Sequence, residues 1–255
     1  MEETDEFEYD VLEKRIKQEG DRKTFAKVFD DQSIKAVHAL ANKGLFDILE
    51  HIISTGKEAH VFVATDVSGN PRAVKIFKKE TTDFKRMQEY IVDDRRFQGL
   101  RKDRRNLVFA WAKKEYKNLL LSNRAGLSVP VPLGIKENVI VMEFIGENNN
   151  PAKKLKETKT TKKELEAYLE QIVDFMARLY LAGLVHADLS EYNILVKDKN
   201  LVIIDFAQAV LLNHPKAKDF FERDVRNMAN FFSKKGLKIS FEVLYAKVKT
   251  RKNEL

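Results

Sequence analysis

The sequence predicts an α+β protein with a strand-rich first half and a mainly helical second half. Apolar residues flank the turn at 68–71 in the manner of a β-hairpin, whereas residues 165–179 repeat apolar side chains at helical spacing. Hydrophobic residues make up 44% of the 255 positions. The chain can therefore bury a substantial core, as one or two domains.

The amino-terminal part is expected to be helical up to about residue 50. Ser33 can cap a helix with Ile34, Val37 and Leu40 on one face, and Gly44 follows its end. The composition then becomes typical of strands over 46–78. The first half thus predicts N-terminal helices followed by a sheet.

The middle of the chain alternates between charged and ordered patterns. Residues 79–110 are highly charged and weakly periodic, which predicts a mobile insertion. Helical spacing returns over 111–125, and residues 129–133 and 139–144 are typical of strands. The polar, turn-rich stretch 146–151 resembles a hinge between two lobes.

The second half is predicted to be helical around one hairpin. Thr161 and Glu164 form a capping-box pattern at the start of a helix that Gly183 closes. Two apolar runs between 193 and 205 are expected to pair across residues 197–200. Further helices are predicted near 216–234 and 240–250.

Composition excludes several kinds of site. The chain has no cysteine, which rules out disulfide partners, thiolate metal sites and a cysteine nucleophile. Its acidic first 20 residues do not resemble a signal peptide, and no apolar run approaches the ~20 residues of a membrane span. We expect a cytoplasmic protein with no membrane partner. The net charge of +7 suits a nucleotide- or RNA-binding protein, or simply a soluble lysine-rich one.

The most informative motif lies after the long helix of the second half. Residues 186–193 have the pattern H-x-D-x-x-x-x-N, and a short apolar strand then ends in Asp205. Phosphoryl transfer needs an aspartate that orients the attacking hydroxyl, together with an amide and a carboxylate that hold Mg²⁺. Asp188, Asn193 and Asp205 could supply these groups.

Two upstream residues fit the same chemistry, although each has a simpler interpretation. Lys75 lies between apolar neighbours on a predicted strand; it could contact ATP phosphates or be a solubilising charge on an edge strand. Glu115 could hold Lys75 in place, or be a solvated carboxylate paired with Lys114 or Lys117.

A candidate phosphate loop precedes Lys75. Residues 54–59 contain one glycine where ordinary kinases have G-x-G-x-x-G, and the spacing is not that of a Walker A loop. Backbone amides near Gly56 could still approach phosphate, helped by the Ser54 and Thr55 hydroxyls and by Lys57.

Together these motifs closely resemble the RIO family of atypical protein serine kinases, in the subfamily with an S-T-G-K-E-A phosphate loop. The resemblance covers about residues 50–230 and rests on six segments: Ser54–Ala59, Ala73–Lys75, Val141–Glu147, Leu184–Asn193, Ile204–Ala209 and Glu222–Asn227.

The resemblance implies a two-lobed protein-kinase-like fold of minimal RIO type. An N-terminal helical extension (1–45) would precede the kinase N-lobe (46–145, with the insertion 79–110) and a reduced C-lobe (146–255). Only 50 residues follow Asp205, and they contain no A-P-E sequence. A full activation segment and the peptide-docking subdomains are therefore not expected.

The resemblance also implies roles. Asp188 would be the catalytic aspartate, and Asn193 and Asp205 would bind Mg²⁺ or Mn²⁺ on ATP. The Asp205 counterpart is thought to accept phosphate during an ATPase cycle, and the histidine of the motif is usually structural. The adenine would lie near Met142, Glu143 and Ile145, whose simpler interpretation is an ordinary buried strand end.

RIO proteins act in small ribosomal subunit maturation, so the resemblance implies partners in a small-subunit precursor, its RNA and its proteins. The insertion could contact them or be a solvated loop; its basic residues include Arg95, Arg96, Arg101, Lys102, Arg104 and Arg105. Two alternatives stay open at this stage. One is a small-molecule kinase of the aminoglycoside or choline kinase type, and the other is an assembly factor that mainly hydrolyses ATP.

Overall fold

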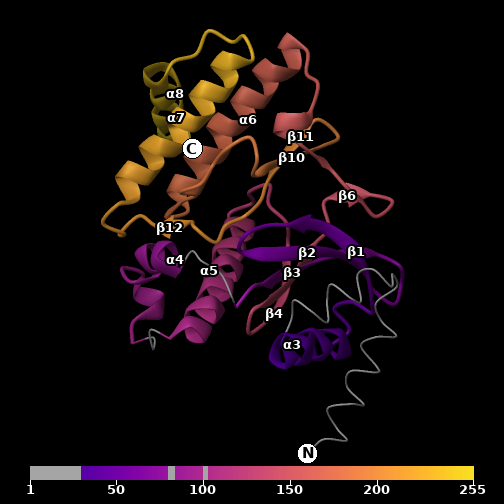
Figure 1. The fold of residues 1–255 in the computed structure, drawn as a ribbon. Helices are drawn as coiled ribbons and strands as arrows, with labels where there is room; N and C mark the ends of the chain where they lie inside the picture. Colours follow the sequence, from indigo (N-terminus) through magenta and orange to yellow (C-terminus); the bar gives the residue numbers. More distant parts are fainter. Residues whose placement is uncertain (1–29, 80–83, 100–102) are drawn as a thin grey trace, which may run out of the picture. The chain divides into compact units, whose positions relative to one another are not determined.

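The computed structural model describes residues 30–79, 84–99 and 103–255 (Figure 1). They form two compact units. The first unit takes the described residues up to 88, 99–116 and 131–151; the second takes 89–98, 117–130 and 152–255. The predicted N-terminal helices before residue 30 lie outside the described residues. The predicted lobe boundaries stay a prediction.

The first unit contains an antiparallel five-stranded sheet with the order β1-β2-β3-β5-β4. Its strands are β1 (Ile48–Thr55), β2 (Ala59–Thr65), β3 (Pro71–Phe77), β4 (Pro132–Lys136) and β5 (Val139–Glu143). The hairpin predicted around residues 68–71 is confirmed, with Thr65 opposite Pro71. Strand β3 is the centre of the sheet, where Lys75 lies opposite Val61 and Ile140.

Helix α3 (Asp31–Asn42) packs on this sheet and belongs to the first unit. Val37 and Leu40 are buried with Val74 and Val141 in one apolar cluster. The prediction that Ser33 caps the helix is wrong: Asp30 is the cap, and its carboxylate accepts from the Ser33 amide at 2.9 Å. Two cap-forming residues three positions apart fit one sequence equally well, and only the packing of α3 selects the first.

The charged stretch 79–110 is more ordered than predicted. It contains α4 (Phe84–Ile91) and a 3-10 turn, η1 (Arg95–Phe97), and α5 (Arg104–Arg124) begins within it. Met87, Tyr90 and Phe97 are buried. These segments are short and carry few apolar residues each, so the periodicity was too weak to predict them. Residues 80–83 and 100–102, including Arg101 and Lys102, lie outside the described residues.

Two other predictions are corrected near the end of the first unit. The strand predicted at 129–133 is β4, which runs over Pro132–Lys136; neither Pro130 nor Pro132 has an amide hydrogen to donate, and proline is tolerated only as the first residue of such a strand or at an edge. The predicted hinge at 146–151 forms a minimal hairpin of β6 (Gly146–Glu147) and β7 (Asn150–Pro151).

The second unit follows the sequence prediction closely. Thr161 and Glu164 make both bonds of the capping box at the start of α6 (Lys162–Leu181), and Gly183 adopts φ +85° after its end. The remaining elements are β8 (Lys153–Lys154), η2 (Leu155–Glu157), β9 (Leu184–Val185), β10 (Ile194–Lys197), β11 (Asn200–Ile203), β12 (Val210–Leu211), α7 (Ala217–Lys234) and α8 (Phe241–Glu254).

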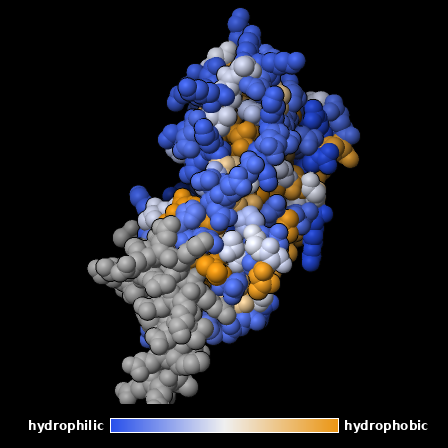
Figure 2. All heavy atoms as spheres, turned by 90° about the vertical axis from the view of Figure 1, so that its right-hand side faces the viewer, coloured by the Kyte–Doolittle hydropathy of each residue, from blue (hydrophilic) through white to orange (hydrophobic). Residues whose placement is uncertain are grey.

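The face drawn in Figure 2 is largely hydrophilic, with scattered apolar residues, as a charged content of 33% would suggest. Among the described residues, no helix is both long and apolar enough to cross a membrane.

Candidate functional site

Lys75 and Glu115 form a close ion pair in the first unit. The Lys75 ammonium donates to both Glu115 oxygens, at 2.9 and 2.7 Å. The Glu115 side chain is 1% exposed and that of Lys75 is 11% exposed. Lys75 lies on the central strand, so the edge-strand interpretation is wrong; Glu115 is buried, so the interpretation as a solvated carboxylate is also wrong. The sheet and α5 hold a cation at a fixed position.

The candidate phosphate loop joins β1 to β2. Residues 54–57 are exposed, and the Gly56 amide donates to the Ala59 carbonyl at 2.9 Å. Lys78 donates to the Gly56 carbonyl at 2.7 Å. Ser54 and Thr55 end β1 and Lys57 lies in the turn; all three are exposed, so a ligand could reach them, and their predicted contact with phosphate stays a prediction.

The predicted adenine contacts lie at the end of β5. Met142 and Ile145 are buried, and the Glu143 amide donates to the Val131 carbonyl at 2.8 Å. Because that amide is already bonded, it cannot donate to an adenine ring. The group that Glu143 could offer is its carbonyl, which could accept from an adenine amino group. The Ile145 amide would be the complementary donor.

In the second unit, the predicted catalytic side chains lie together. The Asn193 amide nitrogen donates to the Asp188 carbonyl at 2.9 Å and to its carboxylate at 3.2 Å. Gln208 donates to the same carboxylate oxygen at 3.1 Å. The Ile204 amide donates to the Asn193 carbonyl at 2.9 Å, which places Asp205 beside Asn193 at the end of the β10–β11 hairpin.

A buried carboxylate on α7 anchors the loop that carries Asp188. Asp224 is 1% exposed and accepts from the Ala187 amide at 2.7 Å and from the Leu189 amide at 2.9 Å. Arg223 donates to the Ala187 carbonyl. Burial raises the pKa of Asp224 to about 7, although the two amide bonds and the Arg223 charge oppose that shift. Both peptide neighbours of Asp188 are thus fixed.

His186 packs beneath the same loop, as predicted. Its Nε2 atom lies 3.1 Å from the Ile204 carbonyl, and its ring meets the Phe206 ring edge to face at 4.8 Å. Asp205 adopts φ +66°, a left-handed conformation that few non-glycine residues adopt. The contacts of His186 are those of a structural residue.

Sequence reasoning assigned no role to several residues that hold the site. Asp224 and Gln208 lie inside segments that carry the family resemblance, so their motifs marked them without showing what they touch. Asn227 donates to the Leu189 carbonyl at 3.2 Å. Asn118 donates to two backbone carbonyls, those of Phe206 and Ala209. No local pattern distinguishes Asn118 from any other helical asparagine.

The donor set around Asp205 suits a hard cation that arrives with a nucleotide. Mg²⁺ in such sites takes one or two carboxylates and completes its shell with water and phosphate oxygens. Asn193 turns its amide nitrogen toward Asp188, so its side-chain oxygen is the atom that could bind a metal. The described residues contain no group of three or more His, Cys, Asp or Glu residues that could hold a metal alone.

Comparisons with known proteins agree with this geometry. The model of the RIO domain matches residues 60–245. The RIO-type serine/threonine-protein kinase Rio1 of Haloferax volcanii is 40% identical over 238 residues, covering 93% of this chain and 81% of that protein. Human serine/threonine-protein kinase RIO1 is 36% identical over 221 residues, covering 86% of this chain and 39% of that protein.

The fold has relatives among solved structures. The Rio2 kinase of Chaetomium thermophilum, crystallised as an ADP/Mg²⁺-phosphoaspartate complex, superposes with a TM-score of 0.66 at 21% identity. The alignment covers 86% of this chain and 66% of that chain. The two-lobed, minimal RIO-type kinase fold predicted from the sequence is thus confirmed, and the chain belongs to the RIO family of atypical serine/threonine protein kinases.

Proposed function

We propose that this protein transfers the γ-phosphate of ATP to a serine or threonine hydroxyl, with Asp188 as the catalytic base. The observation that carries the proposal is the contact between Asp188 and Asn193 on a loop whose amides are held by buried Asp224. This arrangement fixes a carboxylate where it can orient a hydroxyl and accept its proton.

The other residues of the site would bind the nucleotide. Lys75, held by Glu115, would donate to the α- and β-phosphates, and the turn at Gly56 would approach phosphate with Ser54, Thr55 and Lys57. Asn193 and Asp205 would hold Mg²⁺, with Mn²⁺ as a possible substitute. When bound, the metal neutralises charge that develops on the phosphates. The adenine would contact the Glu143 carbonyl and the Ile145 amide, beside Met142.

Asp205 supports a second reaction at the same site. Its carboxylate could attack the γ-phosphorus, forming an acyl phosphate while the bond to the bridging oxygen breaks and ADP leaves. Water would then hydrolyse the acyl phosphate, so the net reaction is ATP hydrolysis. The Rio2 complex with phosphoaspartate supports this possibility. Hydroxylamine releases phosphate from an acyl phosphate but not from phosphoserine, which separates the two reactions.

The physiological setting that we propose is maturation of the small ribosomal subunit. Arg95, Arg104 and Arg105 are exposed, and the net charge is +7, both of which suit contact with RNA phosphates. Arg96 does not belong to this set, because its guanidinium bonds Asp94 and Asn118.

The test uses purified protein and γ-labelled ATP, with and without precursor small-subunit particles. Label on serine or threonine of this chain or of a particle protein supports a protein kinase. Hydroxylamine-sensitive label on the chain and particle-stimulated phosphate release support the ATPase cycle. Label transferred to aminoglycosides or choline, with none on protein, would contradict both and favour a small-molecule kinase.

A further inference from the structure

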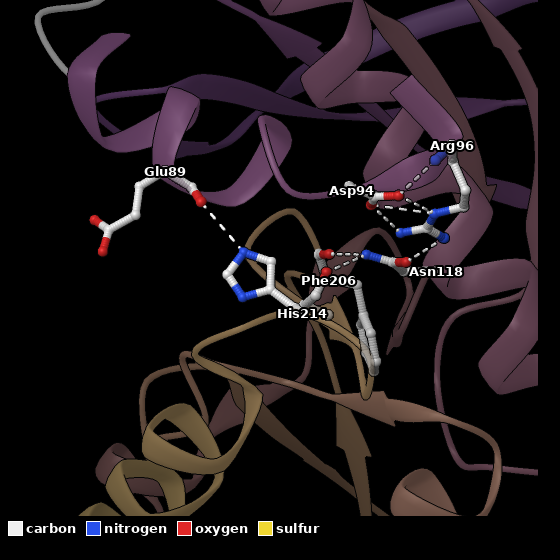
Figure 3. A network of polar contacts seen from close by, with 7 residues as sticks. Glu89, Asp94, Arg96, Asn118, Phe206 and His214 are labelled. Atoms are coloured by element: carbon white, nitrogen blue, oxygen red, sulfur yellow. Dashed lines mark hydrogen bonds and ion pairs between the residues drawn. The ribbon is translucent and has the colours of Figure 1, made fainter. Parts of the chain in front are cut away.

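Asn118 occupies an unusual position in the second unit. It lies on α5, three residues after Glu115, and is 0% exposed. Its amide nitrogen donates to the Phe206 carbonyl at 2.9 Å and to the Ala209 carbonyl at 2.8 Å. These two carbonyls belong to the loop that begins with Asp205. One buried side chain therefore ties both ends of the turn that follows the proposed metal ligand (Figure 3).

The orientation of this amide is fixed by a second layer. Arg96 donates to the Asn118 side-chain oxygen at 2.9 Å. An arginine can only donate and backbone carbonyls can only accept, so the opposite orientation of the amide would break all three bonds. The side chain thus has one orientation that satisfies its surroundings.

Arg96 is itself held in place. Its guanidinium donates to both oxygens of Asp94, with the shortest distance 2.6 Å, and the Arg96 backbone amide also bonds Asp94. The Asp94 side chain is 3% exposed and that of Arg96 is 16% exposed. Bonds in such a buried, charge-assisted network are short and directional, so they hold the side chains of Asp94, Arg96 and Asn118 in one arrangement.

The backbone conformation of Asp205 indicates what the hydrogen-bond network of Asp94, Arg96 and Asn118 stabilises. Asp205 adopts φ +66°, in the left-handed region that non-glycine residues rarely adopt, although aspartate does so more often than most. Asn118 bonds the carbonyl of the next residue, Phe206, and therefore fixes the peptide unit between Phe206 and Ala207, one residue after Asp205.

We propose that Asn118 is a positioning residue for the Asp205 carboxylate, and that Arg96 and Asp94 keep its amide in the required orientation. The inference rests on the proposed role of Asp205 as a metal ligand. Residues that hold a metal ligand in this way typically change metal affinity or activity by about 10–100-fold when replaced.

The main test replaces Asn118 by leucine, which has a similar shape but cannot donate to the two carbonyls. We expect the Mg²⁺ concentration for half-maximal ATP turnover to rise by about 10–100-fold. Nucleotide affinity measured in EDTA should stay unchanged, since the metal makes no contribution there. A general loss of packing would instead also weaken nucleotide binding in EDTA. The matched control is Ser122→Ala, one turn further along α5, because the buried Ser122 hydroxyl has no hydrogen bond within the described residues.

Arg96→Met provides a milder test that leaves Asn118 in place. It should raise the Mg²⁺ requirement in the same direction but by less, and the double variant should be no worse than Asn118→Leu alone, because both changes act through one amide. If Asn118→Leu does not fold, the Arg96→Met shift decides the question. An unchanged Mg²⁺ requirement in the folded variants would overturn the inference.

Asp205→Asn separates this inference from the function it rests on. If Asp205→Asn leaves Mg²⁺-dependent nucleotide binding intact, Asp205 is not the metal ligand and the proposed function fails with the inference. If Asp205→Asn weakens that binding while Asn118→Leu and Arg96→Met do not shift the Mg²⁺ requirement, only the role of Asn118 is rejected.

Discussion

The loop that carries Asp188 and the loop at residues 54–57 are held in different ways. Beneath Asp188, the buried side chain of Asp224 and the partly buried side chain of Asn227 bond the backbone on both sides. Residues 54–57 are exposed: Ser54 and Thr55 end β1, paired with β2, and the turn at Gly56 is held by its backbone bond to Ala59 and by one bond from Lys78. We infer from this difference that the proposed catalytic carboxylate is fixed before substrate arrives, whereas the proposed phosphate loop adjusts to its ligand.

Replacing Asp188 by alanine should have the largest effect. If the anchored loop exists to position this carboxylate, turnover should fall by ~10²–10⁴-fold, the usual contribution of a catalytic base. ATP affinity should change little. Steady-state kinetics and nucleotide titration would measure both, with Glu166→Ala, an exposed carboxylate on α6, as the matched control. Near-normal turnover would show that the anchoring serves another purpose.

Lys75→Met tests whether the first unit also contains a fixed element beside its open loop. The substitution leaves the buried Glu115 carboxylate without its cation, which should lower the free energy of unfolding by about 3–5 kcal/mol. ATP should bind more weakly, because the proposed phosphate contact is also lost. Urea unfolding and nucleotide titration measure the two effects. The double variant Lys75→Met/Glu115→Leu should recover stability but not ATP binding; recovery of both would contradict the phosphate contact.

Asp224→Asn tests the anchor of the catalytic loop through pH. The folded-state pKa of about 7 lies above the unfolded value of 3.8, so between these values the folded protein keeps a proton that the unfolded chain releases. This group's contribution is therefore fully present below about pH 4 and lost as the pH rises to about 7, on the order of 4 kcal/mol in all. Urea unfolding across this range should show that loss in the unmodified protein and not in Asp224→Asn.

A control variant and a kinetic measurement complete the test of Asp224. Asp219→Asn, an exposed carboxylate at the start of α7, should keep the pH dependence of the unmodified protein. Asp224→Asn cannot accept from both amides beside Asp188, so kcat should fall by about 10²-fold, the size expected for misplacing a catalytic group by about 1 Å. An equal pH slope in all three proteins would show that Asp224 is ionised throughout.

The same contrast explains what the sequence could predict. The capping box at Thr161 and Glu164 is a local pattern, and it appears as predicted. The roles proposed for Asp188, Asn193 and Lys75 stay predictions, but these residues were singled out by residue types at fixed spacings, and the structure shows Asn193 bonded to Asp188 and Lys75 bonded to Glu115. Asn118 was not predictable, because its partners at 206 and 209 lie far away in the sequence and nothing local marks them.

Helix α4 shows a second reason why the sequence prediction was incomplete. Its high charge predicted a mobile insertion, yet Met87, Tyr90 and Ile91 are buried. Tyr90 stacks on Phe220 of α7 at 5.1 Å, a contact between residues 130 positions apart. A few apolar side chains suffice to hold a short helix when distant aromatic residues are available, and charge content does not reveal those partners.

Gly56→Ala should have the smallest effect and is the sharpest probe of the open loop. A Cβ atom there would lie 3.4 Å from the Ala59 carbonyl, an ordinary contact, so the free energy of unfolding should hardly change. If phosphate approaches the turn at Gly56 as proposed, the added methyl group should weaken ATP binding by ~10-fold, about the worth of one hydrogen bond to a charged group. Adenosine, which has no phosphate, is the internal control and should bind unchanged. Equal loss of ATP and adenosine affinity would mean that the loop shapes the whole nucleotide site, and unchanged ATP affinity would mean that phosphate does not come close to Gly56.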